Sequence, residues 1–297
     1  MDEKEILKER FKSAVSSAVK VISEKFDLEI KFGTNISSKK NSLNLPEVLS
    51  LKNLQDFTNL RALADSEALK IKYTNKKIYL KNEPEGIIGK SLYAIAEKVR
   101  YEKIGSDKLK GIKNNITKCY ENKFKNKKIE EIKTEADVPI TESFELYMRS
   151  HFFKIKPNKT TKKILSYWQD LFDKNLKKKL KELDDCLENQ SKFNHIVSEM
   201  INKLDFADTN SKEKEEQKET QKNKSSSEND SVENNQANKE EENQENEYNF
   251  NIDDADINSM NENDSLNQNE AKEIIGDPNL KKRYQKNLFK DKYKIFT

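Results

Sequence analysis

The chain contains very little cysteine or histidine, with two residues of each among 297. Cys119 and Cys186 show no C-x-x-C spacing, so the sequence indicates neither a disulfide framework nor a zinc site. We expect both to be buried free thiols in a reducing compartment. His151 and His195 share no metal-binding spacing such as H-x-x-x-H. The sequence therefore offers no metal ligand set and no cofactor-binding residues.

Long apolar segments are also missing. No run approaches the roughly 18 apolar residues that a membrane span needs, and the first residues, Met-Asp-Glu-Lys-Glu, lack the apolar core of a secretory signal. These absences predict a cytoplasmic protein with no membrane partner. Only 33% of the residues are hydrophobic and 37% are charged, which leaves room for one modest core.

Charge divides the chain into three parts. Residues 207–275 hold roughly 20 acidic and 7 basic residues, whereas the rest of the chain is basic, although the overall net charge is only +3. This segment has too few apolar residues to offset the entropy of ordering, so we predict a disordered acidic linker. It separates a domain at residues 1–206 from a basic, aromatic tail at residues 276–297.

Apolar residues spaced three and four apart predict that residues 1–206 form a mainly α-helical domain. In the first helix the expected core stripe is Leu7, Phe11, Ala14, Ala18, Val21 and Ile22. Residues 76–81 fit either a helix or a short strand. Further helices are predicted at residues 54–73, 91–104, 108–124, 139–152 and 193–204, with one helix or two in series at residues 165–187.

Two features are predicted to interrupt the helices. Residues 28–33 and 42–45 alternate apolar and polar side chains, which predicts a small β-hairpin near residues 28–45. Gly105 is expected to end the helix that begins at Ser91, because glycine is common just past a helix C-terminus.

The residues that carry the most information are charged ones inside an apolar helix. Arg100 falls on the extension of an apolar arc formed by its own helix. A buried arginine needs a carboxylate partner, and the candidates are Glu97, three residues earlier, and Asp65 from the preceding helix. Together with Arg61 and Glu102, these residues form either a structural ion-pair network or a contact surface for a partner subunit. We expect no catalytic residue among them.

A near match to the phosphate-binding loop G-x-x-x-x-G-K-[ST] occurs at residues 84–91. Pro84 replaces the first glycine of that pattern, which removes both the tight turn and a backbone N–H donor. We therefore expect no nucleotide to bind there.

Two motifs show a family resemblance. R-x-x-A-D-x-x-A-L at residues 61–69 and E-x-x-R-x-E-x-x-G at residues 97–105, followed by Gly111-Ile112, resemble the N-terminal region of the T subunit of aerobic cobaltochelatase, the CobT family. The similarity covers about residues 8–206 and resumes at residues 293–297. In that family, histidines often occur near positions 74 and 79, where this chain has Thr74 and Tyr79.

The resemblance implies an accessory, non-ATPase subunit that helps to insert Co²⁺ into hydrogenobyrinic acid a,c-diamide during aerobic cobalamin synthesis. The implied partners are an AAA+ ATPase, the S subunit, and a large N subunit that holds the tetrapyrrole. Such a complex would use ATP, Mg²⁺ and Co²⁺, with none of them bound by this chain. The family's von Willebrand A-like C-terminal domain carries a D-x-S-x-S motif that is not found here, so the resemblance implies a truncated or split subunit.

Two other functions remain open at this stage. One is a helical scaffold protein, unrelated to chelation, whose basic domain engages its own or another acidic segment. The other is an RNA-associated protein, because the basic tail with its interleaved aromatics could neutralise phosphates and stack on bases. The acidic segment would compete for the same basic groups, which makes nucleic acid the less favoured partner.

Overall fold

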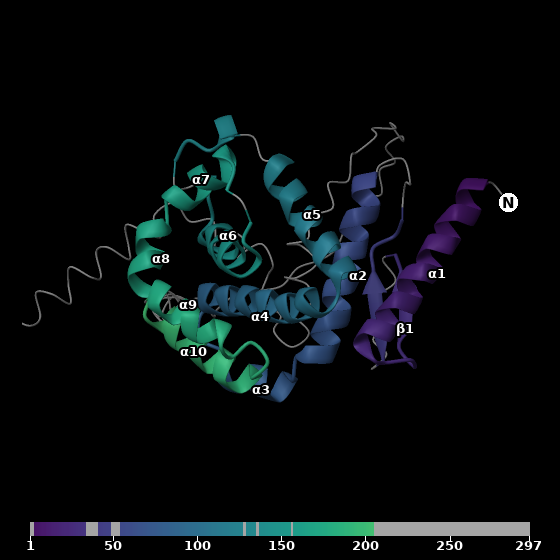
Figure 1. The fold of residues 1–297 in the computed structure, drawn as a ribbon, viewed down its shortest axis with the longest axis horizontal. Helices are drawn as coiled ribbons and strands as arrows, with labels where there is room; N and C mark the ends of the chain where they lie inside the picture. Colours follow the sequence, from purple (N-terminus) through teal and green to yellow (C-terminus); the bar gives the residue numbers. More distant parts are fainter. Residues whose placement is uncertain are drawn as a thin grey trace, which may run out of the picture. The chain divides into compact units, whose positions relative to one another are not determined.

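Ten α-helices and two short strands make up most of the part of the chain that this computed structural model describes (Figure 1). The described residues are 3–33, 41–48, 54–126, 129–134, 137–155 and 157–204. The predicted acidic segment at residues 207–275 and the tail at residues 276–297 lie outside them. The elements are α1 (Glu3–Ser23), β1 (Glu29–Phe32), β2 (Ser42–Leu45), α2 (Leu54–Tyr73), α3 (Lys76–Asn82), α4 (Ile87–Lys108), α5 (Lys110–Asn126), the 3₁₀ turn η1 (Ile129–Glu131), α6 (Ile140–Phe153), α7 (Lys159–Ser166), α8 (Gln169–Asn175), α9 (Lys177–Asp184) and α10 (Gln190–Asn202).

The fold class is mainly α, as the apolar spacing predicted. Helix α4 lies at the centre of the described helices and packs against α2, α5, α6 and α10 (Figure 1). Most of its residues are buried, which is the property of a helix surrounded by others. None of the described helices combines the length and the apolar character needed to cross a membrane.

The predicted helix end at Gly105 is wrong. Helix α4 continues to Lys108, and Gly105 is buried inside it. A Cβ atom at position 105 would overlap the side chain of Leu69 on α2. Glycine is present because it allows two helices to approach closely, a reason that a single sequence does not reveal.

Replacing Gly105 with alanine should destabilise the domain relative to a matched glycine replacement. Overpacking against the buried Leu69 costs about 1–3 kcal/mol, offset by up to about 1 kcal/mol from removing a helical glycine. Gly111, in α5, has nothing within 4 Å of its Cβ position, so Gly111→Ala is the control. Urea unfolding should show Gly105→Ala to be the less stable of the two; equal stability would contradict the close-packing explanation.

The two strands form a parallel pair, so the predicted β-hairpin is wrong. Glu29 is paired with Ser42 and Phe32 with Leu45 in the same direction, whereas a hairpin joins antiparallel strands. Alternation of side chains predicts strands but not their relative direction. The nine residues between the strands can span up to about 30 Å when extended, enough to return to the start of a four-residue strand.

Residues 165–187 were predicted to form one helix or two in series, but the structure divides this region among three short helices, α7, α8 and α9. The apolar residues Trp168, Phe172 and Leu176 in the middle of the region are nevertheless buried. The Trp168 indole N–H donates to the carbonyl of Val138 at 3.0 Å. Residues 76–81, which fitted two structures, belong to α3, whose first turn is capped by the side chain of Asn75.

The side of helix α1 that faces the core overlaps the predicted stripe only in part. The helix packs on α2 and buries Val15, Val19 and Ile22, and Phe11 of the stripe packs edge-on against Phe57 of α2. Of the predicted stripe only Ile22 is buried, while Leu7 and Val21 are 53% and 63% exposed. The sequence places apolar residues on two sides of this helix, and periodicity alone could not decide which side meets α2.

Candidate functional site

The candidate site consists of two buried arginines on neighbouring helices. Arg100 on α4 and Arg149 on α6 are 1% and 0% exposed, and both are among the largest fully buried side chains of the described residues. An unpaired buried charge would be very costly, so the contacts of each guanidinium define the site.

Arg100 is neutralised by Glu97, one of its two predicted partners. Its Nε lies 2.8 Å from Glu97 Oε2 and its Nη2 lies 2.7 Å from Glu97 Oε1, a bidentate pair. The same guanidinium donates to the carbonyl of Tyr73 at 2.6 Å and to that of Leu187 at 3.0 Å. Arg100 therefore joins α4 to the end of α2 and to the segment that precedes α10.

Glu97 is held by two neutral donors as well. The Thr74 hydroxyl donates to Glu97 Oε1 at 2.8 Å, and the Gln190 amide donates to the same oxygen at 3.1 Å. Tyr79 packs against Tyr93, with ring centroids 4.7 Å apart. Thus Thr74 and Tyr79, at the positions where the resembled family often has histidines, serve in hydrogen bonding and packing.

Arg149 was missed by the sequence analysis, and it links two buried acids. Its Nη1 lies 2.7 Å from Glu102 Oε2, and its Nε lies 2.9 Å from Glu145 Oε1. Its guanidinium carbon is 3.3 Å from the centre of the Tyr120 ring, a cation–π arrangement. The Nη2 atom has no hydrogen-bond acceptor within the described part of the chain.

Two further residues contact the acids that pair with Arg149, one charged and one neutral. Lys123 on α5 lies 2.9 Å from Glu145 Oε2, and the Ser66 hydroxyl donates to Glu102 Oε1 at 2.5 Å. Glu102 therefore pairs with Arg149 and not with Arg100. The sequence does contain a sign of the Glu145–Arg149 ion pair, because the two residues are four apart within an apolar helix. That spacing is also usual for exposed ion pairs on helices, so it does not show that the pair is buried.

Asp65, the other predicted partner of Arg100, instead forms a third pair, with Arg61. Arg61 Nη2 lies 2.8 Å from Asp65 Oδ1, and the Asn115 amide donates to Asp65 Oδ2 at 2.7 Å, which ties α2 to α5. Burial raises the pKa of Asp65, and the charge of Arg61 opposes that rise only in part. Because the folded pKa is raised, ionised Asp65 costs stability as pH rises above the unfolded value near 3.8.

The arrangement fixes the relative positions of the helices, and few of its side chains are accessible to a ligand or partner. Of the five predicted residues, Asp65, Glu97, Arg100 and Glu102 are buried, and the side chain of Arg61 is 26% exposed. The described residues contain no group of three or more His, Cys, Asp or Glu that could hold a metal ion. The chemistry of the site is therefore charge neutralisation inside a helical core.

Glu145 should make stability depend on acidity. Burial pushes its pKa up, but the charges of Lys123 and Arg149 outweigh burial and hold the pKa well below its usual range. The ionised form therefore stabilises the fold above the unfolded value near 4.5, and that contribution is lost as pH falls below it. The unfolding free energy should fall more steeply below about pH 4.5 in the wild type than in Glu145→Gln.

Glu121→Gln, at an exposed position of α5, is the matched control for this measurement. It should keep the wild-type slope of unfolding free energy against pH in urea titrations. If Glu145→Gln also keeps that slope, Glu145 does not ionise in the way that its charged neighbours imply.

Comparison with known proteins gives one family. A family model described as cobalamin biosynthesis protein CobT matches residues 6–276. The match spans both charged motifs, at residues 61–69 and 97–105. No solved structure matches the chain.

Proposed function

Because the chain belongs to the CobT family of cobalamin biosynthesis proteins, we propose that it is an accessory subunit of ATP-dependent cobaltochelatase. In this role it helps to insert Co²⁺, a substrate of the reaction, into the corrin ring of hydrogenobyrinic acid a,c-diamide in the cytoplasm. The observation that carries the proposal is the family match over residues 6–276, which includes every residue of the buried ion-pair network.

The contacts of the motif residues support a scaffolding role. In R-x-x-A-D-x-x-A-L, Arg61 and Asp65 pair with each other, and Leu69 meets the close-packing Gly105 of the second motif. In E-x-x-R-x-E-x-x-G, Glu97 neutralises Arg100 while Glu102 neutralises Arg149. The motifs thus specify how the helices pack, and a rigid core of this kind is suited to presenting surfaces to other subunits.

The proposed division of labour assigns ATP hydrolysis and tetrapyrrole binding to partners. An AAA+ ATPase, the S subunit, uses ATP and Mg²⁺, and a large N subunit holds the corrin ring. This chain joins the two and binds no nucleotide of its own. In the near match to the phosphate loop, Pro84 stands in place of the first glycine, so one backbone N–H donor is missing.

An omission assay tests the proposal. Purified N and S subunits are incubated with ATP, Mg²⁺, Co²⁺ and the corrin substrate, with and without the full chain, and insertion is followed by the change in corrin absorbance. We expect insertion only when all three proteins are present. Equal insertion without this chain would reject the proposal, and so would ATP hydrolysis by the purified chain alone.

A binding assay separates chelation from a scaffold role unrelated to it. The tagged full chain should retain the purified S subunit in the presence of ATP and Mg²⁺. If neither the S nor the N subunit is retained, and the omission assay also shows no dependence on the chain, a scaffold with other partners becomes the better assignment.

A further inference from the structure

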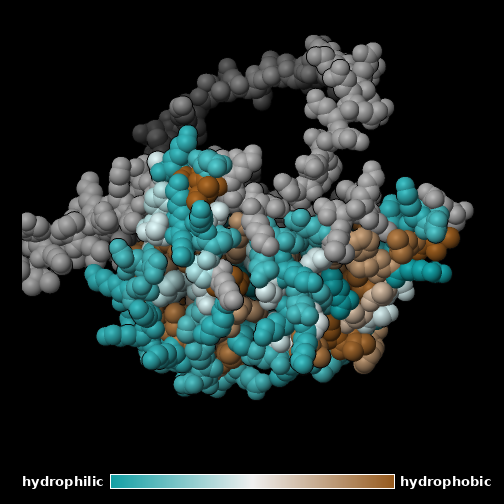
Figure 2. Space-filling view, turned by 45° about the horizontal axis from the view of Figure 1, so that its top comes forward, coloured by the Kyte–Doolittle hydropathy of each residue, from teal (hydrophilic) through white to brown (hydrophobic). Residues whose placement is uncertain are grey.

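The small sheet has edges with no neighbouring strand. Within the described residues the strand order is β1-β2, so each strand has one side without a strand partner. A row of unpaired backbone groups at a sheet edge is a template for pairing with another chain. The sheet lies on the same side of the domain as α1, where hydrophobic residues are concentrated in the space-filling view (Figures 1 and 2).

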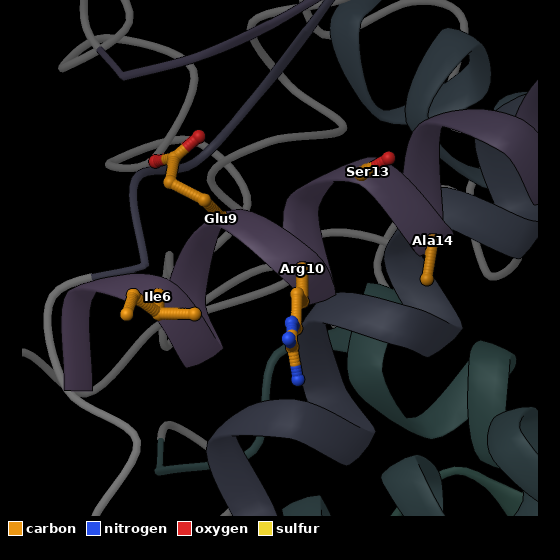
Figure 3. A pocket seen from close by; sticks show the side chains of 5 residues that line it. All are labelled: Ile6, Glu9, Arg10, Ser13 and Ala14. Carbon is orange, nitrogen blue, oxygen red and sulfur yellow. The ribbon is translucent and has the colours of Figure 1, made fainter. Parts of the chain in front are cut away.

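Helix α1, on that side, does not by itself define a partner. A shallow depression of about 510 Å³ on the helix includes Ile6, Glu9, Arg10, Ser13 and Ala14 among its lining residues (Figure 3). An acid, a base, and small and apolar side chains are mixed there, so neither charge nor apolar character selects one class of ligand. The sheet edge carries a more specific pattern.

The open edge of β1 is formed by the backbone of Ile30 and Phe32. The N–H groups of Glu29 and Gly33 donate to carbonyls of the β2 side at 2.9 Å. Because alternate residues of a parallel strand bond to the same neighbour, Lys31 also faces β2, while Ile30 and Phe32 face away from it. No backbone hydrogen bond reaches Ile30 or Phe32 on that outer side within the part of the chain that the structure describes.

The outer edge of β2 is less suited to pairing. Pro46 follows the strand directly and has no N–H to donate. Ser42, at the other end of β2, already makes a further contact in its own chain. Proline at an edge is one of the features that protect a sheet from added strands, so β1 is the edge that remains open.

The side chains of β1 form a pattern that is complementary to itself in reverse. Leu28, Glu29, Ile30, Lys31 and Phe32 read apolar, acidic, apolar, basic, apolar. Alternation along a strand places the two charged side chains on one face and the apolar ones on the other. The charged pair is accessible: Lys31 and Glu29 are 34% and 47% exposed, with their charged atoms 3.5 Å apart.

We infer that β1 pairs antiparallel with β1 of a second copy of the chain, about a two-fold axis through Ile30. In this register Ile30 faces its symmetry mate and exchanges both backbone hydrogen bonds with it. Glu29 of each copy faces Lys31 of the other. The Phe32 N–H donates to the Leu28 carbonyl across the axis, since the Leu28 N–H is already bonded to the carbonyl of Lys25 at 3.3 Å.

Charge selects this register from its neighbours. A shift of two residues in one direction sets Lys31 against Lys31, and a shift in the other direction sets Glu29 against Glu29, both of which are destabilising cross-strand pairs. A shift of one residue would place the apolar side chains of the two copies on opposite faces. The two-fold arrangement joins the sheets into one of four strands and closes on itself, so the assembly stops at a dimer.

Association of the full chain is the first test. Sedimentation velocity over roughly 1–100 µM should show a reversible dimer, because one strand pair buries a small area. Glu29→Lys sets like charges opposite each other twice, by symmetry, and should weaken dimerisation about 10-fold or more, as should Lys31→Glu. Glu182→Lys is the matched control, because Glu182 is 51% exposed and also pairs with a lysine of its own chain, and it should leave dimerisation unchanged.

A mixture of the two single variants tests the register directly. The Glu29→Lys copy then carries two bases on this face and the Lys31→Glu copy two acids, so the two should form a heterodimer although neither pairs well with itself. The double variant Glu29→Lys, Lys31→Glu exchanges the charges and should dimerise like the wild type. A loss caused by misfolding would not be recovered by mixing.

Ile30→Pro tests the backbone contribution. Proline removes the outward N–H of residue 30 but none of the N–H groups that bond to β2, a position that an edge strand tolerates. We expect this variant to keep the circular dichroism spectrum of the wild type and to lose the dimer. Ile30→Val keeps the N–H and should remain dimeric.

Three results would overturn the inference: a wild-type chain that is monomeric at every concentration, Glu182→Lys as disruptive as Glu29→Lys, or single variants that do not associate when mixed. If the wild type is monomeric while Ile30→Pro abolishes retention of the S subunit, the edge takes up an extended segment of that subunit and not a second copy. The omission assay is read separately, so failure here leaves the cobaltochelatase proposal intact.

Discussion

Replacement of Arg149 with methionine is expected to destabilise the domain by about 3–5 kcal/mol or more, because it breaks a buried ion-pair network by removing its central member. Methionine fills much of the volume but leaves Glu102 and Glu145 buried, with Lys123 able to pair only with Glu145. Since whole domains are stable by only about 5–15 kcal/mol, a loss of this size removes a large fraction of the free energy of unfolding. Urea unfolding followed by far-ultraviolet circular dichroism measures the change.

Two variants control the Arg149 experiment. Arg149→Lys keeps the charge but loses the planar fork that reaches both carboxylates, so an intermediate loss is expected. Lys118→Met removes an exposed cation from α5 and should change stability by no more than about 0.5 kcal/mol. A wild-type unfolding midpoint for Arg149→Met would show that the network does not hold the helices together.

Replacement of Arg100 with methionine should lower the free energy of unfolding by a similar amount, about 3–5 kcal/mol, because it leaves the Glu97 carboxylate buried without its positively charged partner. It also removes the donors that satisfy the carbonyls of Tyr73 and Leu187. Adding Glu97→Leu to this variant should recover part of the loss, because the unpaired carboxylate is then gone. Unfolding free energies of the wild type, the two single variants and the double variant form a double-mutant cycle.

The cycle should give a coupling energy of about 1–3 kcal/mol between Arg100 and Glu97. Recovery should remain incomplete, since the two carbonyls stay without their donor. Strictly additive losses would instead indicate that Arg100 acts through the carbonyls alone and that Glu97 is satisfied by Thr74 and Gln190.

Local patterns predicted the parts of this protein that depend on a single helix. The span of α2 agrees with the predicted bounds, and Glu97 was one of the two acids predicted as a partner of Arg100. Three-residue spacing on a helix brings two side chains within reach of each other, but it did not exclude Asp65 as the partner. The family likewise followed from the order and spacing of the two charged motifs.

Contacts between distant segments decided the rest. Gly105 was predicted to end a helix, but it lies inside α4 against Leu69 of α2. Arg149 was missed, because its pairing with Glu102 joins α6 to α4. The parallel direction of the two strands was likewise not predictable from the alternation of their side chains.

By itself, then, the sequence determined the helical class, the burial of Arg100 with an acidic partner and membership of a cobalamin biosynthesis family, because these depend on composition and short-range spacing. Only the tertiary structure decided which side of α1 faces α2 and which acid neutralises each arginine. The physical reason is that burial depends on the neighbouring elements. When a helix has apolar residues on two sides, or an arginine has several acids within reach, the packing of the other helices decides which side is buried and which acid forms the pair.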